Sequence, residues 1–154
     1  MSAATALVDL EHSTVHAKVE IAAPPARVFR AITQPRQLAA WWGDPAHYRT
    51  EDWQLELHPG APWSCKAIGA DGSISSVRGV VEQVEAPHRL VMTWSPSWDD
   101  FASSTIVYEL SATEGGTLVV VTHSGFASAE SCQGHGDGWL RVLGWLAGKI
   151  ADLE

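Results

Sequence analysis

The chain has 154 residues, which is enough for one domain with a sizeable core and too few for two. Its hydrophobic content of 45% and charged content of 18% are globular values, and no apolar run reaches the length of a membrane span. The formal net charge of -8, without a basic cluster, argues against binding to nucleic acid or to an anionic membrane. We expect a single domain over residues 1–154.

The first residues lack the basic start and apolar core of a secretory signal, which predicts a cytoplasmic protein. The two cysteines, Cys65 and Cys132, form no motif and are expected to stay reduced. Eight tryptophans are the unusual feature of the composition. Tryptophan fills cores, which is the more frequent role for each one taken singly, but it also lines concave sites for flat or apolar ligands.

The first part of the chain predicts one strand and two short helices. Residues 12–21 alternate apolar and polar side chains, as in a half-buried strand. Pro24 and Pro25 end this strand, and Pro25 suits the first turn of a helix that continues to Thr33. After Pro35 a second short helical segment ends before Gly43. About six further strands with short turns follow between residues 48 and 126, and their succession predicts an antiparallel meander.

The last segment, residues 137–153, has the clearest helical pattern in the chain. Asp137 is the predicted N-cap, because its carboxylate can accept from the free amides of the first turn. One side of this helix is apolar and is expected to face the sheet; it consists of Trp139, Val142, Leu143, Leu146, Ile150 and Leu153. Trp145 falls on the polar side, where it could stack on Arg141 or Lys149 or enter a second subunit. We expect a homodimer contact through Trp145.

Several motifs, taken in order, resemble the SRPBCC superfamily. They are IAAPPARVFRAIT at residues 21–33, WWG at 41–43, an L-x-x-x-W-S strand at 90–95, THSGF at 122–126 and GWLRVLGWL at 138–146. Within the superfamily, residues 14–153 are most similar to the C-terminal domain of the activator of heat-shock protein 90 ATPase. Where relatives usually read R-P-G-G, this chain reads HPGAP at 58–62, so Ala61 and Pro62 depart from the usual turn geometry.

The resemblance implies an α+β helix-grip fold. In this fold a curved antiparallel sheet, here of about six or seven strands, wraps around the long C-terminal helix, and the two short helices close one end. Members commonly hold an apolar ligand between sheet and helix, and few in this branch have a defined activity. We therefore expect a small hydrophobic or aromatic ligand to contact Trp41, Trp42, Trp63, Trp94, Tyr108, His123, Trp139, Leu143 and Leu146.

Two aromatic segments allow more than one role. Trp41 and Trp42, at the end of the second short helix, would form a lid over the open end of the grip or would simply seal the core there. The polar loop after Trp94 carries Trp98 and Phe101, and a loop this aromatic indicates a cavity entrance or a partner surface.

The sequence contains no motif for nucleophilic catalysis, phosphate binding or dinucleotide binding. Among seven scattered histidines, only His12 and His16 are four residues apart, and on a strand roughly 13 Å would separate them, too far to share an ion. We predict no metal and no cofactor. Strand alternation turns His123 toward the final helix, near Trp139. One reading is a core histidine with satisfied hydrogen bonds, or one that fixes the corner at Gly125 and Phe126 by a hydrogen bond. The other reading is a polar contact for a ligand or a general base.

Three functions follow from these patterns. Binding of a small hydrophobic molecule is the leading hypothesis. The second is an enzyme of the cyclase, dehydratase or hydrolase type, which needs two or more polar groups in the cavity, and the sequence offers only His123 as a good candidate. The third is an interaction module that assists a chaperone ATPase, as the family name suggests. In the eponymous activators a separate N-terminal domain precedes this one, whereas here the chain begins almost directly with the first strand, which weighs against the third hypothesis.

Overall fold

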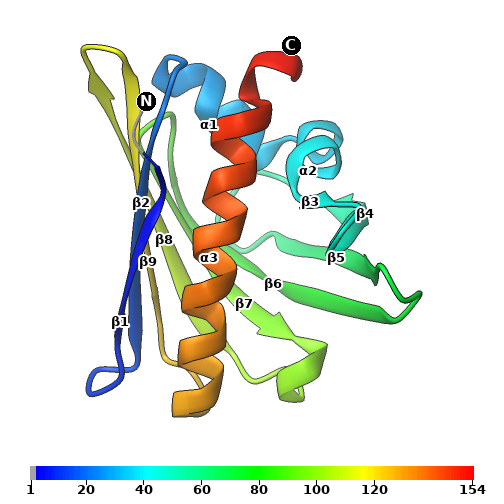
Figure 1. Cartoon of the computed structure of the whole chain (residues 1–154). Helices are drawn as coiled ribbons and strands as arrows, with labels where there is room; N and C mark the ends of the chain where they lie inside the picture. Colours follow the sequence, from blue (N-terminus) through cyan, green and yellow to red (C-terminus); the bar gives the residue numbers. More distant parts are fainter. Residues whose placement is uncertain (1–2) are drawn as a thin grey trace.

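One curved antiparallel sheet of nine strands wraps around the C-terminal helix α3 (Figure 1). The computed structural model describes residues 3–154. The strands are β1 (Thr5–Asp9), β2 (Thr14–Ile21), β3 (Gly43–Asp44), β4 (Tyr48–Gln54), β5 (Pro62–Gly69), β6 (Ile74–Glu85), β7 (Arg89–Pro96), β8 (Ser104–Thr113) and β9 (Gly116–Ser124). Their order across the sheet is β1-β2-β9-β8-β7-β6-β5-β4-β3. The meander from β3 to β9 therefore closes by pairing β9 with β2, which comes before the two short helices in the chain.

The predicted α+β helix-grip architecture is confirmed, whereas the expected number of six or seven strands is wrong. The two additional strands are β1 and β3, which lie at the two edges of the sheet. β1 pairs only with β2, and its residues are exposed or half-buried, so its sequence has no strong alternation. β3 has only two residues and pairs with the start of β4, which is too short for any periodic signal.

The two predicted short helices are α1 (Pro25–Thr33) and α2 (Pro35–Trp41), each with proline in its first turn. Both lie near the end of α3 that carries the C-terminus (Figure 1). Arg27 of α1 donates from Nη2 to the carbonyl oxygen of Ile150 at 2.8 Å. Arg30 forms a two-bond ion pair with Glu154, with both N···O distances at 2.8 Å. These contacts fasten the end of the chain to α1.

Helix α3 (Ala129–Lys149) continues into a short 3-10 helix, η2 (Ile150–Asp152). It begins earlier than predicted, and its N-cap is Ser128, whose side chain accepts from the Ser131 amide, not Asp137. The early turns were not recognised because three glycines, Gly134, Gly136 and Gly138, occupy them, and glycine has a low helix propensity. The longer helix brings residues 129–136 onto the wall that faces the sheet.

Gly136 is required where α3 approaches the edge strand β1. A Cβ atom at this position would lie 2.3 Å from Cγ2 of Val8. Real side-chain atoms do not approach so closely, so any larger residue would force the Val8 side chain, or β1 with it, to move. The absence of a side chain at Gly136 thus sets the distance between helix and sheet at this end.

The hydrophobic core lies between the concave face of the sheet and α3. The predicted alternation of the first long strand is confirmed, since Val15, Ala17, Val19 and Ile21 are all buried. The predicted apolar side of α3 is also buried, from Trp139 to Ile150. In β9, His123 pairs with Val15 of β2, so its imidazole lies in this buried layer. Among residues 3–154, no helix is both long and apolar enough to cross a membrane.

Candidate functional site

A cavity of about 900 Å³ lies between α3 and the half of the sheet formed by β4, β5 and β6. Its volume is that of a site for a small organic molecule. The space is hollow because small residues line both walls: Gly134 and Gly138 on the helix, and Ala67, Gly69 and Ser75 on the sheet. In Figure 1 these strands spread away from α3, whereas β1, β2 and β9 lie close to it.

Three tryptophans separate the cavity from the closed core behind it. Trp42, Trp53 and Trp94 each line both the cavity and a residual internal space of about 10 Å³, which is too small for a ligand. The ring centroid of Trp42 lies 5.5 Å from that of Trp53, 6.1 Å from that of Trp94 and 5.9 Å from that of Trp139. Because these rings contact one another, they form a continuous aromatic wall around one part of the cavity.

The indole N–H groups of this wall are used within the protein. Trp42 donates to the Tyr48 hydroxyl oxygen at 3.2 Å, and Trp53 donates to Thr50 Oγ1 at 2.9 Å. Trp94 donates to His135 Nε2 at 3.1 Å, and Trp139 donates to His123 Nδ1 at 2.9 Å. The hydrogen bonds fix the orientation of each ring, so the wall offers ring faces and edges to a ligand, with no free indole donor among these four residues.

His123 lies beneath the wall, fully buried, with partners at both ring nitrogens. An indole nitrogen is only a donor, so Nδ1 must accept from Trp139 and the ring proton lies on Nε2. Nε2 donates to Ser104 Oγ at 2.7 Å, and that hydroxyl donates to the Trp94 carbonyl at 3.1 Å. Burial, with a smaller contribution from nearby His135, lowers the pKa of His123 well below its ordinary value. The geometry is that of a neutral core histidine, and His123 does not line the cavity.

His135, on the first half of α3, lines the cavity and was not singled out from the sequence. Its Nδ1 donates to the Ser131 carbonyl at 2.8 Å, which leaves Nε2 to accept from Trp94. Burial lowers the pKa of His135, although the Ser131 carbonyl and Asp99 act in the opposite direction. It precedes Trp139 by one helical turn, a spacing that would have identified it had the helix been predicted to begin at Ala129.

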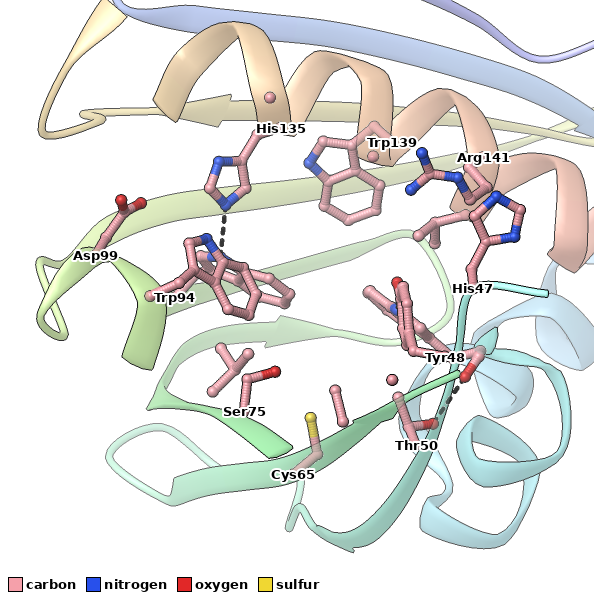
Figure 2. A pocket seen from close by; sticks show the side chains of 18 of the residues that line it. His47, Tyr48, Thr50, Cys65, Ser75, Trp94, Asp99, His135, Trp139 and Arg141 are labelled. Atoms are coloured by element: carbon pink, nitrogen blue, oxygen red, sulfur yellow. Dashed lines mark hydrogen bonds between the residues drawn. The ribbon is translucent and has the colours of Figure 1, made fainter. Parts of the chain in front are cut away.

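The other end of the cavity is polar. Figure 2 places Arg141 of α3 above Tyr48 of β4, with His47 beside them. Arg141 is the only arginine or lysine among the residues that line the cavity. Burial raises the pKa of the Tyr48 hydroxyl, while the hydrogen bond from Trp42 and the charge of Arg141 act to lower it. Tyr48 is therefore a neutral phenol at physiological pH.

Cys65, on β5, is another titratable group that lines the cavity. Burial raises the pKa of its thiol to about 12, so at neutral pH it is not a thiolate nucleophile. Within residues 3–154, no three histidine, cysteine, aspartate or glutamate side chains are arranged to hold a metal ion.

The residues predicted to contact a ligand fall into three groups. Trp42, Trp94 and Trp139 line the cavity. Trp63 and Tyr108 line the residual space behind the aromatic wall. The other four, Trp41, His123, Leu143 and Leu146, are buried in the core and line neither space. The indole of Trp41 donates to the Ala31 carbonyl at 2.8 Å, an arrangement that seals the core.

Trp98, on the 3-10 helix η1 (Ser97–Asp99), lines the cavity and is 54% exposed, in keeping with a position at the entrance.

Trp145 is half-buried against the same chain. Its Nε1 donates to Asp44 Oδ2 at 3.0 Å, and its ring contacts Tyr48 with centroids 5.4 Å apart. Lys149 Nζ lies 5.8 Å from the ring centroid, which agrees with the expected cation contact. Trp145 thus holds β3 and β4 against α3. The homodimer contact through Trp145 stays a prediction.

Comparison with known proteins gives a family match over most of the chain. The model of the family described as "Activator of Hsp90 ATPase homolog 1-like protein" matches residues 22–149. No curated protein sequence matches the chain.

Solved structures share the fold over nearly their whole length. Protein Ms6760 from Mycobacterium smegmatis is 27% identical, with a TM-score of 0.79 over 94% of this chain and 92% of that one. A protein from Rhodobacter sphaeroides is 20% identical, with a TM-score of 0.80 over 97% and 99% of the two chains. The AHSA1 protein from Silicibacter pomeroyi is 24% identical, with a TM-score of 0.79 over 90% and 97%.

Proposed function

The chain belongs to the family of activator of Hsp90 ATPase homolog 1-like proteins, and from this premise we propose that it binds a small apolar or aromatic molecule in the cavity between α3 and strands β4 to β6. The observation that carries the proposal is the combination of a cavity of about 900 Å³ with a tryptophan wall whose N–H groups are already satisfied. Such a wall favours a flat or apolar molecule, because a ligand of this kind gains apolar and aromatic contacts without competing for the indole hydrogen bonds.

The rigidity of the wall supports this proposal. Each ring is held by a hydrogen bond and by at least one neighbouring ring, so little side-chain freedom remains to be lost on binding. The two walls of the cavity also carry small residues that leave room beside the rings, such as Gly138 and Ala67. A ligand that fills this space would replace water at apolar surface, which is the main favourable contribution to binding in such sites.

The test is ligand binding by a variant in which the cavity is filled. No atom lies within 4 Å of a Cβ built at Gly138, and Gly138 lines the cavity. The substitution Gly138→Leu therefore adds a side chain at the cavity wall, and its Cβ meets no neighbouring atom. The matched control is Gly144→Leu, at an exposed position of the same helix that also has open space and lies outside the cavity.

Wild-type protein and both variants would be titrated with a panel of naphthalene, biphenyl and fatty-acyl compounds, followed by native mass spectrometry and calorimetry. We expect the wild type and Gly144→Leu to bind the same members of the panel, and Gly138→Leu to lose about tenfold or more in affinity. Binding of no member by the wild type, or equal binding by Gly138→Leu, would refute the proposed site.

A further inference from the structure

The polar end of the cavity carries a cation that has no counter-ion. Arg141 is half-buried, and it forms no ion pair within 4 Å and no side-chain hydrogen bond with any residue in the described range 3–154. Asp137 lies one turn earlier on the same helix, yet it is exposed and does not pair with Arg141. A guanidinium that is partly removed from water and unpaired gains most from an anionic partner.

Tyr48 supplies a hydrogen-bond donor at the same end. Its hydroxyl oxygen accepts from Trp42 Nε1 at 3.2 Å, which occupies one acceptor position and leaves the phenolic hydrogen free to donate. No described residue accepts that hydrogen. In Figure 2 the Tyr48 hydroxyl and the Arg141 guanidinium lie on the same side of the cavity, and Trp139 and Trp94 lie beyond them.

The carboxylates that line the cavity do not fill this position. Asp71 Oδ1 accepts from the Ser73 hydroxyl at 2.6 Å, and Asp99 Oδ2 accepts from the Ser131 hydroxyl at 2.6 Å. Glu130 is in the first turn of α3 and is separated from Arg141 by three helical turns, about 16 Å along the axis. Asp71 follows Gly69, which pairs with Tyr48, so it belongs to the same end as Arg141, where Ser73 holds its Oδ1. Asp99 lies at the opposite end of the cavity from Arg141 in Figure 2, and Glu130 is in the first turn of α3, so of the two ends the one that carries Arg141 is the more favourable for a negative group.

We propose that the ligand is a planar aromatic carboxylate, with its carboxylate on the Arg141 guanidinium and the Tyr48 hydroxyl and its ring system against Trp42, Trp94 and Trp139. This inference rests on the proposed function and specifies the ligand class for the same cavity. The planar fork of arginine matches the two oxygens of a carboxylate, and the aromatic wall accepts the attached rings. An uncharged aromatic of the same size would fill the same wall and leave Arg141 unpaired.

The test compares two probes that differ only in the charged group. Calorimetry would measure the affinity of the protein for 2-naphthoate and for 2-naphthalenemethanol. We expect the carboxylate to bind about tenfold or more tightly than the alcohol, since a hydrogen bond to a charged group is among the stronger ones. Equal affinity of the two probes would overturn the inference and leave the proposed function standing. If neither probe binds and no other aromatic or apolar compound binds, the proposed function itself fails.

Variants of Arg141 and Tyr48 then test which residues cause the preference for naphthoate over the alcohol. Arg141→Gln should remove the preference for naphthoate while the alcohol binds as before, and unchanged binding of the alcohol also demonstrates an intact cavity. Tyr48→Phe should weaken the binding of naphthoate several-fold and the binding of the alcohol by less. Arg141→Lys should retain part of the preference, because it keeps the charge and loses the fork.

The matched control for net charge is Arg36→Gln, on the exposed surface of α2 and outside the cavity. This variant should keep the full preference for naphthoate. An equal loss in Arg36→Gln and Arg141→Gln would show a general effect of charge and would overturn the assignment to Arg141.

Discussion

Trp139 and His123 are joined by a hydrogen bond of 2.9 Å from the indole N–H to Nδ1, and this bond fixes the protonation state of the histidine. An indole cannot accept, so the imidazole must present a lone pair to it. The same relationship recurs between Trp94 and His135 at 3.1 Å. Two neutral histidines therefore hold two tryptophans of the cavity wall, and both pairs would be broken by protonation of the ring.

Replacing His123 should lower the free energy of unfolding, because its side chain is buried in the core and does not line the cavity. His123→Ala removes a fully buried side chain, leaves the Trp139 N–H without its acceptor and takes from the Ser104 oxygen the N–H that it accepts. We expect the free energy of unfolding to fall by about 2–4 kcal/mol, measured by urea denaturation. Ser104→Ala is the milder comparison, with an expected loss of about 1 kcal/mol. Unchanged stability in His123→Ala would contradict the role of a core histidine.

Stability should fall as the pH falls below about 6.5. Burial makes the pKa of both His123 and His135 lower in the folded protein than the ordinary value of 6.5. Between the folded and unfolded pKa values, only the unfolded chain binds the proton, so the free energy of unfolding decreases with falling pH by about 1.4 kcal/mol per pH unit for each imidazole. Above about pH 7 both imidazoles are neutral in the folded and the unfolded chain, so this loss of stability is absent there.

Urea denaturation at pH 8, 7, 6 and 5 would measure this slope. The variant His135→Gln should have a smaller slope than the wild type, since one of the two imidazoles is removed. A stability that stays constant between pH 7 and pH 5 would contradict the assignment of both histidines as neutral acceptors.

Gly136 and Gly144 should respond in opposite directions to the same substitution. Gly144→Ala meets no atom within 4 Å and should raise the free energy of unfolding by up to about 1 kcal/mol through helix propensity. Gly136→Ala places a methyl group against Val8 and should lower it by about 1–3 kcal/mol. Thermal or urea unfolding measures both. Adding Val8→Ala to Gly136→Ala should recover part of the loss, and failure to recover would show that the contact with β1 is not the cause.

The thiol of Cys65 should be unreactive in the folded protein although it lines the cavity. With a pKa of about 12, only about one molecule in ten thousand carries the thiolate at pH 8, and the side chain is 5% exposed. Alkylation by iodoacetamide, followed by peptide mass mapping, should label Cys65 slowly in buffer and rapidly in urea. Rapid labelling of Cys65 under native conditions would place this residue in a more open and polar environment than the structure does.

The alternation of β2, the prolines at the starts of α1 and α2, and the apolar side of α3 predicted these elements, whereas their helix-grip arrangement was expected from the resemblance to the SRPBCC superfamily. These features are local, because each follows from the period of a single element. The start of α3 was predicted wrongly at Asp137, since glycine weakens the local helical signal, and the tertiary contact of Gly136 with Val8 explains why glycine is there. The edge strands β1 and β3 were missed because pairing with a neighbour, and not periodicity, makes them strands.

What the sequence determined by itself was the set of aromatic residues and the side of each element that is buried. Only the tertiary structure decided which of them border open space. Trp42, Trp94 and Trp139 line the cavity, whereas Trp41, Leu143 and Leu146 fill the core, although all of them are buried residues of apolar faces. The physical reason is that a cavity is a difference in volume between two facing walls, and small residues far apart in the chain, such as Ala67 and Gly138, create it. Arg141 on α3 and Tyr48 on β4 are also far apart in the sequence. They line the same cavity because the fold packs α3 against the sheet, and the spacing of residues along the chain does not reveal this.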